Sequence, residues 1–153
     1  MYIVEHINSL EQFLEHTQIV SVMKDQMDYI GSPKTRTQIM ETIKLAFSNE
    51  SSYLIVISDE GVTIGFAFYN IAVGMESAGK YIWLNEMHIH SEYRSQGYGA
   101  LLFDEIVDWC KRHNIVRIMG MADENEENTL RFYKKQGADI YKQNIIHYRV
   151  LSF

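Results

Sequence analysis

Residues 81–100 read YIWLNEMHIHSEYRSQGYGA, and this stretch decides the fold. Its first half is rich in large apolar and β-favouring residues and contains no Pro or Gly, which predicts a strand. Its second half, from Arg94 to Ala100, is a short turn that contains Gly97 and Gly99. Glycine removes the Cβ atoms that would hold an anion away from backbone N–H groups, and Arg94 adds a forked cationic donor. A strand, a glycine turn and a helix in this order predict a phosphate-binding turn.

A helix is predicted directly after this turn, from Ala100 to Asn114, because apolar residues recur there at helical spacing. Acidic residues lie early in it and basic residues late, which suits the helix dipole. The apolar positions are Leu102, Phe103, Ile106 and Cys110. The glycine turn therefore opens a helix.

The motif Arg94-x-x-Gly97-x-Gly99 resembles the acetyl-CoA signature Q/R-x-x-G-x-G/A of the GNAT superfamily of N-acetyltransferases. The preceding IHSEY run is similar to the family's V-h-P-e-y, with Ser91 in place of the usual Pro. Residues 130–138, LRFYKKQGA, resemble the second signature, fY-x-k-x-G-[FA]. This resemblance implies an α/β (α+β) fold, with one mixed, mostly antiparallel central sheet flanked by helices. It also implies a single N-acetyltransferase domain over residues 1–153.

The same resemblance implies that acetyl-CoA is the co-substrate. The pantetheine arm would pair with the central strand around Met87, His88 and Ile89, where a backbone N–H near Ile89 would polarise the thioester carbonyl. The pyrophosphate would lie on the turn, whose residues are Arg94, Ser95, Gln96, Gly97, Tyr98, Gly99 and Ala100. Relatives often contact the pantetheine arm through an Asn that here corresponds to Glu126. Asn125 and Asn128 flank that position, and Asn128 is the expected contact.

Acetylation of an amine requires a base for the ammonium proton and benefits from an acid for the leaving thiolate. Glu86 aligns with a carboxylate near the amine in relatives such as the spermidine/spermine N-acetyltransferases. It is the candidate base and would take the amine proton through a water molecule. Its alternative is a solvated carboxylate at the end of a strand. Tyr133 matches the tyrosine near the coenzyme sulfur in the second signature and is the candidate acid. Its alternative is a helix tyrosine packed on the sheet.

Side-chain alternation would place Glu86, His88 and His90 on one face of a regular strand, although the family usually carries a bulge here. Two histidines in a His-x-His pattern could hold a metal ion, but they lack a third ligand. No metal is expected.

The length of 153 residues predicts one domain. The formal charge of −6 and the lack of a basic run argue against a nucleic-acid partner. Cys110 is the only cysteine, so an internal disulfide is excluded and a reducing compartment is favoured. Neither a signal peptide nor an apolar run long enough to span a bilayer is present in the sequence. A cytoplasmic protein without a membrane partner is expected.

The rest of the chain alternates between predicted helices and strands. Ser9 with Gln12, and Thr35 with Gln38, form capping-box patterns at two helix starts. The helices are predicted at 10–29, 35–48 and about 123–136, and the strands at 2–7, 52–58, 62–73, 115–122, 140–141 and 145–151.

The predicted function is acetyl transfer from acetyl-CoA to a primary amine by direct attack in a ternary complex, since no nucleophilic Cys is placed for a covalent route. A small amine or polyamine is the first expectation for the acceptor, and a peptide amine the second. The alternative is a non-catalytic acyl-CoA sensor or interaction module on the same fold. A nucleoside-triphosphate enzyme fits poorly because the turn lacks a G-K-[ST] ending. Exposed edge strands would permit a homodimer.

Overall fold

A computed structural model describes residues 1–151, in two compact units that divide after Met121. The first unit holds a five-stranded sheet whose strands lie side by side in chain order. All neighbours are antiparallel except the last pair, which is parallel. The strands are β1 (Tyr2–Ile7), β2 (Ser52–Asp59), β3 (Val62–Gly74), β4 (Gly79–Ile89) and β5 (Arg117–Gly120). The prediction of a mixed, mostly antiparallel sheet is confirmed.

The first helical region differs from the prediction. Instead of one helix over 10–29, the chain forms α1 (Leu10–Glu15) and α2 (Ile19–Tyr29), separated at His16, where φ is −90° and ψ is 80°. Phe13 and Ile19 are six residues apart, so they would point about 120° apart around one continuous helix. The break allows both side chains to be buried, at 1% and 0% exposure.

Capping explains where the next helix begins. In α3 (Arg36–Phe47), the amide of Gln38 donates to the Thr35 hydroxyl and the amide of Thr35 donates to the Gln38 side chain, at 3.1 and 2.8 Å. This predicted capping box is confirmed. At the start of α1 the Gln12 amide donates to Ser9 Oγ, but the Gln12 side chain accepts from Asn8 instead of Ser9.

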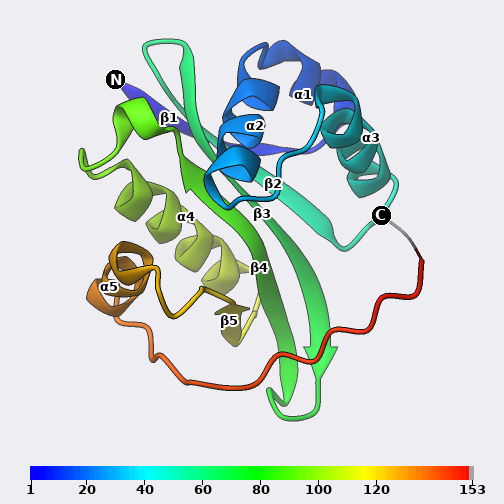
Figure 1. The fold of residues 1–153 in the computed structure, drawn as a ribbon, viewed down its shortest axis with the longest axis vertical. Helices are drawn as coiled ribbons and strands as arrows, with labels where there is room; N and C mark the ends of the chain where they lie inside the picture. The colour runs from blue at the N-terminus through cyan, green and yellow to red at the C-terminus, as the bar shows by residue number, and fades with distance from the viewer. Residues whose placement is uncertain (152–153) are drawn as a thin grey trace. The chain divides into compact units, whose positions relative to one another are not determined.

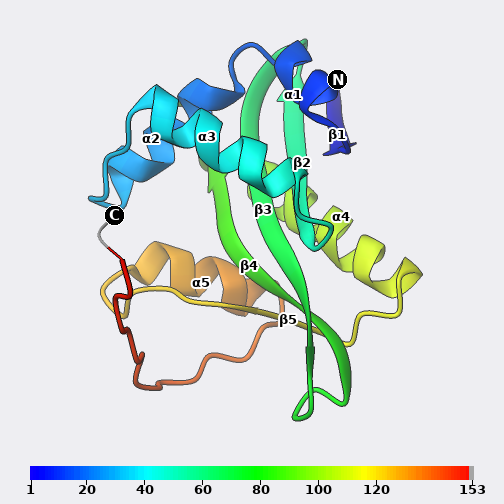
Figure 2. The same cartoon turned by 90° about the vertical axis from the view of Figure 1, so that its right-hand side faces the viewer.

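Helices cover both faces of the sheet in the first unit. Helices α1, α2 and α3 lie on one face, and α4 (Tyr98–Arg112) lies on the other (Figures 1 and 2). Beneath α4, the Trp109 ring lies 5.1 Å from that of Tyr53 and 5.4 Å from that of Tyr69, between centroids. Cys110 is buried on the same helix, as predicted. The core on the opposite face contains Phe13, Ile19, Val20, Met23, Ile39, Ile43, Leu54, Val56 and Phe66.

The second unit contains α5 (Glu127–Lys135), which is followed by Gly137 at a φ of +98°. The helix begins later than predicted because residues 123–125 form a turn, in which the Asp123 carboxylate accepts the Asn125 amide at 2.9 Å. The predicted strands at 140–141 and 145–151 are wrong, since residues 138–151 contain no strand. Alternating apolar residues favour a strand only where a neighbouring strand pairs with them. Ile146 and Tyr148 instead remain 95% and 85% exposed.

Within residues 1–151, no helix combines the length and apolar character needed to cross a membrane.

Candidate active site

Strand β4 is paired along its whole length on one side and along half of it on the other. Its pairing with β3 extends from Gly79 to Ile89. Its pairing with β5 covers only Tyr81 to Leu84. In the part of the first unit that the structure describes, no strand pairs with residues 85–89 on the β5 side. The sheet is therefore open there to a ligand that can pair with a strand.

The backbone groups that face this opening can be identified from one hydrogen bond. The His90 amide donates to the Ile64 carbonyl of β3 at 2.8 Å. The carbonyl and amide of a trans peptide point in opposite directions, so the Ile89 carbonyl points to the open side. The N–H of Ile89 and the polar groups of Met87, two residues earlier, point the same way. The backbone of His88 faces β3 instead. Met87 and Ile89 thus present donors where the sequence predicted pantetheine pairing.

A β-bulge precedes these residues. The β3–β4 register passes from Tyr69 opposite Leu84 to Phe68 opposite Glu86, which leaves Asn85 as the extra residue. The exposed Asn85 side chain donates to Asn70 Oδ1 at 2.6 Å. Glu86 follows the bulge, so its side chain shares a face with that of His88 two residues on.

Glu86 has the environment that a general base requires. Burial raises the pKa of the Glu86 carboxyl to about 7. Removing a carboxylate from water penalises its charged form, and this burial is the cause of the shift. At neutral pH the carboxyl therefore divides between its protonated and ionised forms. It can accept a proton from a substrate and release it again.

The glycine turn has the geometry of an anion site. A short 3₁₀ turn, η1 (Ser91–Tyr93), leads into it, and Ser95 has a φ of +62°. Gly97 caps α4 with a φ of +87°, and a Cβ placed there would meet nothing within 4 Å. The first amides of a helix have no partner within it, and here they belong to Tyr98, Gly99 and Ala100. A phosphate can approach these N–H groups, and the residues present fit the pyrophosphate of a coenzyme A thioester.

The side chain of Tyr98 has a structural role that is separate from that of its backbone N–H. Its hydroxyl donates to Asp59 Oδ2 at 2.6 Å, which ties the start of α4 to the end of β2. This hydrogen bond raises the pKa of Tyr98 and lowers the pKa of Asp59. Tyr98 can contribute its backbone to an anion while its side chain fixes the helix.

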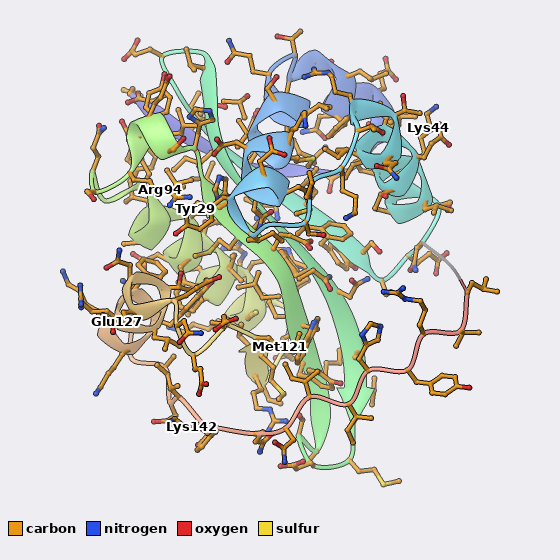
Figure 3. The ribbon with its side chains drawn as sticks, viewed as in Figure 1. Tyr29, Lys44, Arg94, Met121, Glu127 and Lys142 are labelled. Atoms are coloured by element: carbon orange, nitrogen blue, oxygen red, sulfur yellow. The ribbon has the colours of Figure 1, made fainter. Side chains whose placement is uncertain are left out.

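Arg94 points away from the turn and toward α2 (Figure 3). Its guanidinium lies over the Tyr29 ring, 4.2 Å from the centroid. Its Nε donates to the Ile89 carbonyl at 3.1 Å, and its Nη2 donates to His88 Nδ1 at 3.2 Å. The other ring nitrogen of His88 lies 2.7 Å from Asp25 Oδ2. Arg94 was predicted to lie beside the phosphates, and Asp25 was not predicted at all, because no motif distinguishes it from Asp28 in the same helix.

The comparison with protein families decides the identity of the chain. The model described as Acetyltransferase (GNAT) family matches residues 17–138. The chain belongs to the GNAT acetyltransferase family. This family generally uses acetyl-CoA, which agrees with the anion turn and the open side of β4.

Solved structures confirm the GNAT fold. A possible acetyltransferase from Clostridium difficile 630 matches with a TM-score of 0.82 and 15% identity, covering 99% of both chains. An aminoglycoside acetyltransferase from an uncultured soil metagenomic sample matches with a TM-score of 0.73 and 14% identity, covering 99% of this chain and 97% of that one. Ribosomal-protein-alanine N-acetyltransferase from Brucella melitensis biovar Abortus 2308 matches with a TM-score of 0.69 and 10% identity, covering 97% and 100%. The comparison with curated protein sequences found no match.

The remaining residues expected from the GNAT signatures lie in the second unit, on α5. Tyr133 is half-buried, and burial raises the pKa of its hydroxyl to about 12, which keeps it protonated at neutral pH. Asn128 is exposed and accepts a hydrogen bond from Arg131 at 3.3 Å. Glu126 forms the N-cap without a side-chain hydrogen bond to the helix.

Among residues 1–151, no group of three or more His, Cys, Asp or Glu side chains is arranged to hold a metal ion.

Proposed function

We propose that this GNAT protein is an N-acetyltransferase that moves the acetyl group of acetyl-CoA to a primary amine, with the whole chain acting as one catalytic domain. The observation that carries the proposal is the continuity of β4 with the turn. Within 12 residues, from Glu86 to Gly97, the chain supplies a half-buried carboxyl, strand amides on an open side and the cap of an anion-binding helix.

Acetyl-CoA would bind along this path. Its pyrophosphate would accept from the amides at the start of α4, next to Gly97. Its pantetheine amides would pair with the backbone of Met87 and Ile89, as an added strand does. The Ile89 N–H would then donate to the thioester oxygen, where negative charge develops during attack. The backbone of Met87 and Ile89 supports this role because β5 pairs with β4 only as far as Leu84.

Catalysis in this proposal is direct transfer in a ternary complex. The amine nitrogen attacks the thioester carbonyl carbon, and the new C–N bond forms as the C–S bond breaks. Glu86 takes up the proton that the amine loses, directly or through one water, because its pKa of about 7 balances acceptance and release. Tyr133 gives its hydroxyl proton to the departing thiolate and regains one from solvent. Cys110 is buried and burial raises the pKa of its thiol to about 11, so it is unsuited to act as a nucleophile.

A small amine or polyamine is the proposed acceptor. The chain carries a formal charge of −6, which favours cationic substrates over anionic ones. Two structural neighbours support an amine acceptor by their names, an aminoglycoside acetyltransferase and a ribosomal-protein-alanine N-acetyltransferase.

The acceptor class can be tested with a matched panel. The protein would be incubated with acetyl-CoA and, separately, with a polyamine, an aminoglycoside and a peptide with a free N-terminus. Mass spectrometry would then detect the N-acetyl product. The proposal expects the highest kcat/KM with the small polycationic amines. Preferential acetylation of the peptide would reassign the acceptor to a peptide amine.

A further inference from the structure

Three side chains of the first unit converge on one buried histidine. His88 is 6% exposed at the end of β4. Asp25 of α2 lies 2.7 Å from its Nε2, and Arg94 of the glycine turn lies 3.2 Å from its Nδ1. The Tyr29 ring, also from α2, lies 6.0 Å from the His88 ring between centroids. We call Asp25, His88, Arg94 and Tyr29 the clamp.

The two hydrogen bonds fix the tautomer of His88. A guanidinium can only donate, so His88 Nδ1 must accept from Arg94 and carry no proton. The Asp25 carboxylate accepts, so His88 Nε2 must carry the proton and donate. Asp25 is itself held in place, because the Ser91 hydroxyl donates to Oδ1 at 3.2 Å and the Ser91 amide donates to Oδ2 at 3.4 Å. The Asp25 carboxylate therefore keeps the His88 proton on Nε2 and leaves Nδ1 free to accept from Arg94.

Arg94 connects His88 to the backbone that is proposed to bind the coenzyme. The same guanidinium that donates to His88 also donates from Nε to the Ile89 carbonyl, on the open side of β4. Arg94 lies three residues before Gly97 and so joins the last strand residue to the turn. Because Arg94 stacks over Tyr29, the end of β4 and the glycine turn are both attached to α2, on the face opposite α4.

We propose that Asp25 and His88 are positioning residues, which hold Arg94 so that the open edge of β4 and the glycine turn stay in the geometry that binds acetyl-CoA. This inference rests on the proposed function for the role of the turn. It goes further by making helix α2 part of the coenzyme site, through side chains that need not touch the coenzyme.

The clamp is also sensitive to acid. A second proton on His88 would place N–H against N–H at Arg94 and abolish that hydrogen bond. The titratable and charged groups facing the ring are Asp25, Arg94 and His90, whose Nε2 lies 3.8 Å from Asp25 Oδ1. Burial lowers the pKa of His88, and the Arg94 charge adds to this effect while Asp25 opposes it. Burial raises the pKa of Asp25, but the hydrogen bond from His88 and the interaction with His90 outweigh this effect, so the pKa of Asp25 is lowered overall.

The clamp should persist above pH about 6.5, the ordinary pKa of His, and weaken as pH falls through the lower pKa of folded His88.

The test combines two readouts on the full-length protein. Two-bond ¹H–¹⁵N NMR of the imidazole nitrogens reports the tautomer of His88, and calorimetry reports the Kd for acetyl-CoA. We expect the Nε2–H tautomer in the wild type. Asp25→Asn removes the charge and permits either tautomer, because an amide both donates and accepts. It should mix the tautomers and weaken acetyl-CoA binding by roughly 2-fold to 30-fold, the range expected for couplings of this kind.

Two substitutions at His88 separate positioning from simple stability. His88→Asn keeps an oxygen close to the place of Nδ1, so it should still accept from Arg94 and should bind acetyl-CoA without the loss at acid pH. His88→Leu removes the acceptor and should lose affinity at every pH. The matched control is Glu5→Gln, because Glu5 pairs with His16 at 3.0 Å outside the clamp. It should change neither the His88 tautomer nor the Kd.

Three results would overturn the inference. They are an Nδ1–H tautomer in the wild type, a folded Asp25→Asn variant with the wild-type Kd, and equal affinity of His88→Asn and His88→Leu. Failure of the wild type to bind acetyl-CoA would contradict the proposed function as well as the coenzyme role of the clamp. The NMR tautomer in the free protein would then still support or reject the hydrogen-bond order itself.

Discussion

Gly65 lies against the carbonyl of His88, so that a Cβ on Gly65 would meet that oxygen at 2.7 Å. The two residues belong to neighbouring strands, Gly65 to β3 and His88 to β4. A backbone oxygen cannot turn aside as a flexible side chain can. The absence of a side chain at Gly65 therefore allows β4 to approach β3 where β4 carries the candidate site.

Gly65→Ala should consequently destabilise the protein by about 1–3 kcal/mol, the usual cost of overpacking a core. It should also weaken acetyl-CoA binding, because β4 must move where Ile89 lies. Gly79→Ala is the matched control, since its Cβ would meet Val116 at an ordinary 3.7 Å. Denaturant unfolding and calorimetry check both effects. Equal stability of the two variants would show that β3 and β4 can separate locally at no cost.

Gly97→Val should weaken acetyl-CoA binding by about tenfold or more. The residue has a φ of +87°, where a side chain costs about 1–2 kcal/mol, and a valine would also project into the space assigned to phosphate. Gly61→Val is the control, because Gly61 has a φ of +78° with equally open surroundings in the β2–β3 turn. Thermal melts should show similar strain in both variants, with affinity lost only at Gly97. Wild-type affinity in a folded Gly97→Val protein would remove the phosphate turn from the account.

Glu86→Gln should remove a limb of the pH–rate profile. In the wild type, kcat/KM for a good acceptor should fall as pH drops through about 7, because protonated Glu86 cannot accept a proton. The glutamine variant should have a lower kcat without this limb and nearly unchanged acetyl-CoA affinity. Steady-state rates between about pH 5 and 9 are the measurement. An unaltered profile would show that Glu86 is a half-buried carboxyl without a catalytic role.

The same substitution makes an independent prediction for stability. The folded pKa of Glu86 is raised, so its protonated form is favoured by folding, and stability is lost as pH rises from the unfolded value of about 4.3 to about 7. Glutamine does not ionise. Glu86→Gln should therefore gain stability relative to the wild type at pH 8 and lose that advantage at pH 4, as measured by urea unfolding.

The sequence predicts the centre of the fold because its signals there are local. Gly97 at a helix start, the charge order of α4 and the apolar run before Asn85 each act within a few residues. The predicted helix at 100–114 is thus observed at Tyr98–Arg112. No Gly or Pro marks the break at His16 in the sequence. The break depends on burying Phe13 and Ile19 against a sheet whose other strands come later in the chain.

The clamp and the chain end were not predictable for a different reason. Asp25 and His88 are 63 residues apart, and only the packing of α2 on the sheet brings them together. The alternation in residues 145–151 has the period of a strand, but a strand also needs a partner, which periodicity cannot reveal. Arg94 was recognised by motif, yet its direction is set by Tyr29 and the Ile89 carbonyl.

Tyr133→Phe should slow acetyl transfer by roughly 10²-fold to 10⁴-fold if the hydroxyl protonates the leaving thiolate, with the low end favoured because a thiolate is a tolerable leaving group. Coenzyme binding should barely change, since the ring remains. Tyr148→Phe is the control, as Tyr148 is 85% exposed in the same unit. Single-turnover rates and thermal melts are compared. A stable Tyr133→Phe variant with the wild-type rate would leave Tyr133 as a packing residue.

The most direct test of the central claim is amine-dependent release of coenzyme A thiol from acetyl-CoA by the wild-type protein, followed with a thiol reagent over a panel of primary amines. The account predicts saturable release that requires both substrates and yields one N-acetylated amine per thiol. Tight binding of acetyl-CoA in calorimetry, with no thiol released above background for any amine, would contradict it and identify the protein as an acyl-CoA sensor.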